Sequence, residues 1–318
     1  MPAIYLTEED VRDLIDMETS IEVVEEAFRQ LAAGNAKNVP RSRAAAKGIL
    51  LHTMSASAEY LGMIGWKAYT TTRGGARFHV AVYDIASGEM HALIEANYLG
   101  QLRTGAASGV ATRYMAREDS KTVGVFGAGL QARTQLKAVC CVRSIERAEV
   151  YCRDEDRRES FAAEMCDMCQ TDVVSVADPN AVAVGKDIII TASTSKTPVF
   201  DGSGLAKGTH LNVIGSNFLA KSEIDVETIR RADIIVCDSI EQGRLEAGDF
   251  VAAMDEGILH WDQIGELAAV AAASKSGREN EEQITLFKSV GMGIEDVAMA
   301  ARILESAREA GRGVPLPF

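Results

Sequence analysis

Basic side chains are scarce in this chain of 318 residues. Its 33 lysines and arginines are outnumbered by 46 aspartates and glutamates, which gives a formal net charge of -13 at pH 7. Proteins that bind nucleic acids or anionic membranes need clustered cations to neutralise phosphates, so this balance argues against both as main partners. An anionic ligand must instead be held by a few local cations.

Membrane, targeting and metal signals are also missing. No apolar run reaches the roughly 18 residues of a membrane span, and the N-terminal segment MPAIYLTEEDVRDLI is acidic rather than basic. Of the six cysteines, Cys166 and Cys169 form one CxxC pair, with no second pair at zinc spacing. We therefore expect a cytoplasmic protein with free buried thiols, no metal site and no membrane partner.

What the chain has is enough apolar sequence for a large core. Hydrophobic residues make up 47% and charged residues 25%, as in ordinary soluble globular proteins, and the length favours two domains over one. Apolar residues recur at helical spacing over the first 35 residues. Short strands follow in GILLHTMSAS, LGMIGWKAYTTT and the hairpin ARFHVAVYDIASGEMHALIEA, and then a helix rich in small residues, YLGQLRTGAASGVATRYMA.

From about residue 121 the pattern alternates between apolar strands and helices. The strands include KTVGVF, RAEVY, TDVVSV, KDIIIT, THLNVIGS, ADIIVCDS and QITLFKSVG. Because apolar strands that alternate with helices form parallel sheets covered on both faces, we predict an α/β fold here. The last helix, residues 293–311, is expected to pack back onto the first domain.

The stretch VGVFGAGLQARTQLKAV joins one such strand to its helix. In a dinucleotide site Gly127 would permit the sharp turn, Gly129 would let a pyrophosphate approach the backbone, and Ala132 would let the helix lie close to the strand. The helix N-terminus would supply free N–H groups for the phosphates. The alternative is a tight turn without a ligand.

The end of the second strand is where a Rossmann protein recognises the adenosine ribose, and here it reads VYCRDED. Asp154 would accept a hydrogen bond from a 2′-hydroxyl and favour NAD. Arg153 would hold a 2′-phosphate and favour NADP. The two signals conflict, so the cofactor is NAD(H) or NADP(H) with the preference open.

Three cations outside this region point to a substrate site. Arg41 lies in NVPRSR, Lys67 in the apolar strand MIGWKAY and Arg103 in GQLRTGAAS. A lysine within an apolar strand finds a partner or has a lowered pKa, which suits proton transfer to an imine or amine nitrogen. An arginine fork matches a substrate carboxylate. The alternative for each is a surface charge or a structural ion pair.

Several longer motifs carry a resemblance to a known family. They are RTGAASGVATRYMAR, VGVFGAGLQARTQLKAV, IITASTSKTPVFDG, KGTHLNVIGSN, EID, DSIEQGRLEAGD and ITLFKSVGMGIEDVAMAARI. In this order the chain resembles the ornithine cyclodeaminase and mu-crystallin family. The resemblance implies a Rossmann-like parallel-sheet NAD(P) domain, 117–292. It also implies a discontinuous α+β substrate and dimerisation domain, 1–116 with 293–318, and a homodimer.

The resemblance also implies roles for individual residues. Arg41 and Arg103 match the substrate-carboxylate arginines, and Lys67 matches the lysine beside the reacting carbon and nitrogen. The positions that match cofactor contacts are Thr104, Gly127, Ala128, Gly129, Leu130, Gln131, Arg153, Asp154, Thr191, Ser193, Thr194, Val290 and Gly291. Arg73 and Arg77 in TTTRGGARF replace a different turn; they either extend into the pocket, favouring a second carboxylate on the substrate, or form a solvated hairpin.

One departure from the family pattern concerns the reaction. Ornithine cyclodeaminases carry an aspartate in the segment that reads GSNFLAKSEI here, and Asn217 stands at its place. Asparagine cannot act as a carboxylate base, although it can still hydrogen-bond the substrate.

We therefore expect an NAD(P)H-dependent reductase of a small 2-imino acid, in reverse an amino-acid dehydrogenase, with Lys67 as proton donor and the cofactor supplying the redox chemistry. The alternatives are ornithine cyclodeaminase, which forms proline and ammonia, and a non-catalytic ligand-binding protein like the mu-crystallins. The substrate side chain, the physiological direction and any assembly beyond a dimer stay open.

Overall fold

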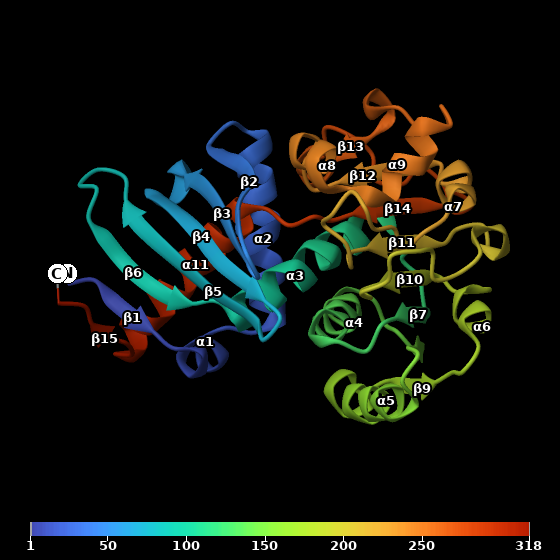
Figure 1. Ribbon diagram of the computed structural model, residues 1–318, viewed down its shortest axis with the longest axis horizontal. Helices are drawn as coiled ribbons and strands as arrows, with labels where there is room; N and C mark the ends of the chain where they lie inside the picture. The colour runs from blue at the N-terminus through green and yellow to red at the C-terminus, as the bar shows by residue number, and fades with distance from the viewer. Residues whose placement is uncertain (1, 318) are drawn as a thin grey trace. The chain divides into compact units, whose positions relative to one another are not determined.

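The computed structural model describes residues 2–317 and contains two compact units (Figure 1). Unit 1 comprises Met1–Arg103 and Gly291–Phe318, and unit 2 comprises Thr104–Val290. These divisions differ from the predicted domain ends at residues 116 and 292. The difference arises because helix α3 (Asn97–Met115) begins in unit 1 and continues into unit 2.

Unit 1 is built on a seven-stranded sheet with the order β15-β1-β6-β5-β4-β3-β2. Its strands are β1 (Ile4–Leu6), β2 (Ala36–Ala46), β3 (Ile49–Ala58), β4 (Met63–Thr72), β5 (Gly75–Asp84), β6 (Met90–Glu95) and β15 (Val314–Pro315). Its helices are α1 (Glu8–Leu14), α2 (Met17–Ala32) and α11 (Gly293–Ala310), besides the short 3-10 helix η1 (Glu59–Leu61). Helix α11 packs on β3, β4 and β5, which confirms the predicted return of the C-terminal helix.

The two faces of this sheet differ because side chains alternate along each strand. On β3 the residues His52, Met54, Ala56 and Ala58 are buried, whereas Ile49 and Leu51 are exposed. The covered face is therefore the one on which α11 lies.

Three strands of unit 1 were not predicted, namely β1, β2 and β15. We expected helices over the first 35 residues, but the short strand β1 precedes α1 and pairs with β6 and β15. Strand β2, AKNVPRSRAAA, lacks alternating apolar residues and contains Pro40. Pro40 is tolerated because β2 is an edge strand. The pairing of β2 with β3 also shifts register between Val39 and Ser42, so that proline costs no ladder hydrogen bond there.

Unit 2 is an eight-stranded, wholly parallel sheet with the order β13-β12-β14-β11-β10-β7-β8-β9. Its strands are β7 (Thr122–Phe126), β8 (Arg147–Tyr151), β9 (Asp172–Ser175), β10 (Ile188–Thr191), β11 (His210–Val213), β12 (Ile234–Cys237), β13 (Gly265–Glu266) and β14 (Thr285–Lys288). Its own helices are α4 (Leu130–Val142), α5 (Glu155–Cys169), α6 (Pro179–Ala183), α7 (Val226–Arg231), α8 (Ile240–Glu246), α9 (Gly248–Asp255) and α10 (Leu267–Ala271), besides the short 3-10 helices η2 (Gly202–Gly204) and η3 (Trp261–Gln263).

Both faces of this sheet are apolar. Ile188 and Ile190 of β10 belong to a core with α4 and α5, and Ile189, between them, belongs to a second core that includes Phe250 of α9. Burial on both faces explains the continuous apolar strands. The predicted α/β class and its Rossmann-like parallel sheet are confirmed.

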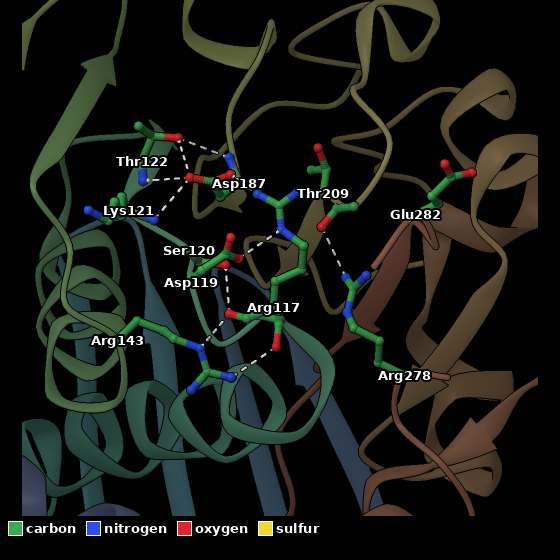
Figure 2. A network of polar contacts seen from close by, with 12 residues as sticks. Arg117, Asp119, Ser120, Lys121, Thr122, Arg143, Asp187, Thr209, Arg278 and Glu282 are labelled. Atoms are coloured by element: carbon green, nitrogen blue, oxygen red, sulfur yellow. Dashed lines mark hydrogen bonds and ion pairs between the residues drawn. The ribbon is translucent and has the colours of Figure 1, made fainter. Parts of the chain in front are cut away.

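A polar network fixes the strand ends opposite the glycine turn (Figure 2). The Asp187 carboxylate accepts hydrogen bonds from the backbone N–H groups of Lys121 and Thr122, at 3.0 and 2.9 Å, and pairs with Arg117. Arg143 donates to the carbonyl of Arg117 at 2.8 Å and to carbonyls at the end of α3. This network ties the entry of β7 to the entry of β10 within unit 2.

Two findings bear on membrane and metal binding. Among residues 2–317 no helix combines the length and the apolar character that crossing a membrane requires. The same residues contain no cluster of three or more histidine, cysteine or acidic side chains placed to hold a metal ion. Cys166 and Cys169 end α5 as half-buried free thiols, not the buried thiols expected. A cytoplasmic location stays a prediction.

Candidate functional site

The glycine turn of unit 2 lies between the end of β7 and the start of α4. Gly127 has a φ of +115°, and a Cβ there would lie 2.4 Å from the carbonyl oxygen of Ala192. A Cβ on Gly129 would meet nothing within 4 Å. Gly127 is thus required by the fold, whereas Gly129 keeps open the space in front of the helix.

The start of α4 has the features of an anion site. Gly129 is its N-cap residue, so no side chain caps the first turn. Ala132 is fully buried against the sheet, as the close approach of strand and helix requires. Unsatisfied N–H groups at a helix start favour phosphate.

A cavity of about 1250 Å³ opens at this turn. It lies at the carboxyl ends of β7, β8 and β10, where the strand order reverses direction, the usual ligand position in open parallel sheets. The predicted cofactor residues that line it are Gly127, Ala128, Gly129, Arg153, Asp154, Ser193 and Thr194. The lining does not include Thr104, Leu130, Gln131, Thr191 or Val290.

A buried glutamate that we did not predict organises the loops beside this cavity. The Glu223 carboxylate accepts hydrogen bonds from Thr191 Oγ1 at 2.9 Å, from the Ser193 N–H at 2.7 Å and from the Gly215 N–H at 2.6 Å. It therefore links the loop after β10 to the loop after β11. The segment KSEID offers no signal of this role, because the partners lie on other strands.

Asn217 and Val290 lie in unit 2 on loops fixed by buried charges. Lys288 donates to the carbonyl of Ser216, the residue before Asn217, at 2.7 Å and pairs with Asp249 at 2.7 Å. The N–H of Val290 donates to Asp238 at 2.7 Å. Asn217 itself is half-buried in the loop after β11.

Unit 1 brings the three predicted substrate cations into its buried interior. Lys67 is 2% exposed, and its Nζ lies 2.7 Å from Asp296 Oδ1. Arg103 pairs through Nη1 with Glu295 at 2.7 Å and through Nε with Asp296 at 3.1 Å. Asp296 thus joins the lysine to the arginine.

Arg41 approaches from the bulge in β2. Two residues, Pro40 and Arg41, lie opposite Met54 where the register shifts, and Arg41 donates to Met54 Sδ at 3.1 Å. Its Nη2 donates to the carbonyl of Gly291 at 3.3 Å. A Cβ on Gly291 would lie 2.4 Å from Arg103 Nη1, so Gly291, predicted to lie near the nicotinamide, stands beside the two arginines.

Close packing around Lys67 explains why position 100 of α3 is a glycine. A Cβ on Gly100 would lie 2.8 Å from Lys67 Nζ, and the same nitrogen lies 5.4 Å from the centre of the Phe78 ring. Burial lowers the pKa of Lys67 to about 8; Asp296 opposes this shift, and the positive charges of Arg103 and Arg41 add to it. At pH 7, below this pKa, most Lys67 side chains are therefore protonated and able to donate a proton.

The acids of this cluster were not predicted. Glu295 and Asp296 occur in GIEDVAMAARI, where two acids in the first turn of a helix are an ordinary feature favoured by the helix dipole. Both are fully buried, however, and they pair with Lys67 and Arg103 instead of facing solvent. The available signal was a pair of acids between apolar residues in the first turn of the helix.

Arg73 and Arg77 belong to the exposed hairpin between β4 and β5. Arg77 is opposite Thr70, and Lys67 is opposite Val80, so alternation along β5 places Arg77 on the other face of the sheet. Within unit 1 these arginines form a solvated hairpin and do not reach Lys67.

Comparisons with known proteins agree with this geometry. A profile of the ornithine cyclodeaminase/mu-crystallin family matches residues 2–311. A Delta(1)-pyrroline-2-carboxylate reductase of Bacillus cereus is 38% identical over 240 residues, 75% of this chain and 74% of the relative.

Solved structures are similar over nearly all of the chain. A Thermococcus litoralis Delta(1)-pyrroline-2-carboxylate reductase, in complex with NADH and L-proline, has a TM-score of 0.94 and 37% identity, covering 98% of this chain and 100% of the other. An archaeal alanine dehydrogenase dimer with bound NAD has a TM-score of 0.94 and 31% identity, with both chains fully covered. The resemblance noted in the sequence is confirmed, and the chain belongs to the ornithine cyclodeaminase/mu-crystallin family.

Proposed function

We propose that this protein is an NAD(P)H-dependent reductase of a small 2-imino acid, which in reverse acts as an amino-acid dehydrogenase. The observation that carries the proposal is the buried cluster of Lys67, Arg41 and Arg103 in a chain that also has a dinucleotide turn. Relatives named for pyrroline-2-carboxylate reduction support this reaction class.

The arginines are proposed to bind the substrate carboxylate. Arg103 uses Nη1 and Nε for Glu295 and Asp296, which fixes the plane of its guanidinium. Arg41 is held by Gly291 and Met54. Two oriented guanidinium groups recognise a planar carboxylate and hold the adjacent C=N bond in place.

Lys67 is proposed to keep the substrate nitrogen protonated. A protonated imine is more electrophilic at carbon, and Asp296 holds the ammonium group in one position at 2.7 Å. The glycine turn and the uncapped start of α4 fit a dinucleotide. When bound, the reduced nicotinamide supplies the hydride.

The test is a panel of reductions followed by the absorbance of the reduced cofactor. The substrates are pyruvate with ammonium or methylamine, iminosuccinate, and pyrroline-2-carboxylate, each with NADH and with NADPH. We expect oxidation of the cofactor with at least one substrate. No oxidation above background with any would overturn the proposal, and proline and ammonia from ornithine with catalytic NAD would establish a cyclodeaminase instead.

The pH dependence should follow the titration of Lys67. Its pKa of about 8 means that the donor is charged below this pH and neutral above it. Reduction rates at saturating substrate should therefore fall as the pH rises through about 8, and oxidation of the amino acid, which needs the neutral amine, should rise over the same range.

A variant separates this titration from that of the substrate. Asp296→Asn removes the carboxylate that favours the charged lysine, so both inflections should move to lower pH. Profiles that keep the same inflection in the wild type and in Asp296→Asn would show that another group titrates.

We also propose that the protein forms a homodimer through the open face of the unit 1 sheet. Strand alternation places several exposed apolar side chains on the face away from α11: Val39 (53% exposed), Ile49 (39%), Leu51 (41%) and Ile64 (46%). An apolar face of this kind usually marks an interface, and an archaeal relative was solved as a dimer.

Light scattering coupled to gel filtration checks the dimer. We expect a dimer for the wild type and a shift toward monomer for Leu51→Glu combined with Ile64→Glu. Leu245→Glu, at another exposed apolar residue in unit 2, is the control and should stay dimeric. A monomeric wild type, or a double variant that stays dimeric, would contradict the assignment.

A further inference from the structure

We propose that the cavity of unit 2 binds NADP(H) in preference to NAD(H), with Arg153, Arg157 and Lys196 holding the 2′-phosphate. The proposal rests on the proposed function only in taking this cavity as the dinucleotide site. Arg153 and Asp154 by themselves left the preference between NAD(H) and NADP(H) open.

Three cations line the cavity and are not neutralised by the protein. Arg153, Arg157 and Lys196 belong to the lining, and none makes an ion pair with a residue of the described chain. Nearby arginines differ: Arg133 pairs with Glu164 and Arg147 with Asp172. In a chain with a net charge of -13, unpaired cations gathered around one cavity indicate an anionic ligand group.

The single acid of the lining already has a structural role. Asp154 is the N-cap of α5, and its Oδ1 accepts a hydrogen bond from the N–H of Arg157 at 3.0 Å. Cys152 is the residue directly after β8, a position where an acid would accept a hydrogen bond from the ribose 2′-hydroxyl. With three cations and one acid, the ionisable side chains of the lining carry a net positive charge.

The cations come from two sides of the cavity. Arg153 follows β8 and Arg157 lies in the first turn of α5, whereas Lys196 belongs to the loop after β10. Arg158, the next residue in α5, turns inward, where it donates to the Cys152 carbonyl at 2.9 Å and to Ser175 Oγ at 2.7 Å. Arg158 thus holds the loop that presents Arg153.

A phosphate monoester matches this arrangement better than a hydroxyl. At neutral pH it carries a charge between about -1.5 and -2 and three acceptor oxygens, which arginine forks bind through charge-assisted hydrogen bonds. A 2′-hydroxyl offers the same cations one weak acceptor. The cavity therefore discriminates between the two cofactors by charge, and removing a single cation must weaken this discrimination.

Dissociation constants for NADPH and NADH, from quenching of protein fluorescence, test the proposal. We expect the wild type to bind NADPH at least about 10-fold more tightly than NADH. Arg153→Ala and Arg157→Ala should each weaken NADPH binding by about 10-fold and leave NADH within about twofold, since each removes a charge-assisted contact. Asp154→Asn keeps a good N-cap and removes the negative charge, so it should increase the preference for NADPH.

Arg147→Ala is the matched control, because Arg147 lies on β8 but is ion-paired and does not line the cavity. It should leave both constants unchanged. Equal affinity for NADH and NADPH, or equal weakening of both in the arginine variants, would overturn the inference while leaving the reductase proposal intact. A clear NADPH preference without any imine reduction would overturn the reductase proposal alone, and failure to bind either cofactor would overturn both.

Discussion

Replacing Lys67 with methionine should lower kcat for imine reduction by about 10²–10⁴-fold, the range of a lost general acid, and leave the cofactor dissociation constant within about twofold. Methionine has a similar volume and fits beside Gly100 and Phe78 without carrying a proton. Single-turnover reduction measures the chemical step, and fluorescence quenching measures the cofactor. A variant with wild-type kcat would show that Lys67 is not the donor.

The fold of this variant needs its own check, because a buried ion pair is broken. Asp296 keeps Arg103 at 3.1 Å, so its charge stays partly compensated. Lys67→Arg provides a second measurement: the cation stays in place, but its pKa is too high for proton transfer near neutrality, so kcat should still fall. Lys37→Met, at an exposed lysine of unit 1, is the matched control and should keep full activity.

Gly129→Val should weaken binding of either cofactor by at least about 100-fold without changing the melting temperature of the protein alone. The added side chain meets no protein atom within 4 Å of its Cβ, but it fills the space that a pyrophosphate needs in front of α4. Differential scanning fluorimetry and cofactor titration measure the two effects separately.

Two other glycines test this interpretation. Gly127→Ala places a Cβ 2.4 Å from the Ala192 carbonyl at a φ of +115°, so it should lower the melting temperature as well. Gly74→Val, in the β4–β5 turn, has its nearest atom at 3.7 Å and should change neither stability nor cofactor binding. Tight cofactor binding by Gly129→Val would contradict the proposed phosphate position.

Much of the fold could be predicted because its signals are local. The central strands of unit 2 are apolar runs that alternate with helices, and the glycine turn follows its strand directly. Helix α3, which is rich in small residues, and the short strands β3–β6 were likewise predicted from their local sequence. Strand β2 was missed because Pro40 and exposed alanines conceal an edge strand, and an edge strand needs no alternating pattern to pair.

The candidate site was predictable only in part. Lys67 stands out because it interrupts an apolar strand, and Arg41 and Arg103 were identified through the family resemblance. Asp296 does not, because it lies in the first turn of a helix, where acids are common. Its contact with Lys67 joins positions 229 residues apart in the sequence, and Glu223 likewise meets Thr191 and Ser193 only across strands.

The sequence by itself determined the α/β class, the glycine turn, the family and the three cations, because each depends on neighbouring residues or on motif order. Only the tertiary structure decided which acids hold those cations, how the β2 bulge turns Arg41 inward and which cations of the cavity have no acidic partner in the described part of the chain. The physical reason is that burial and charge pairing depend on segments distant in the chain, which single-sequence patterns do not connect.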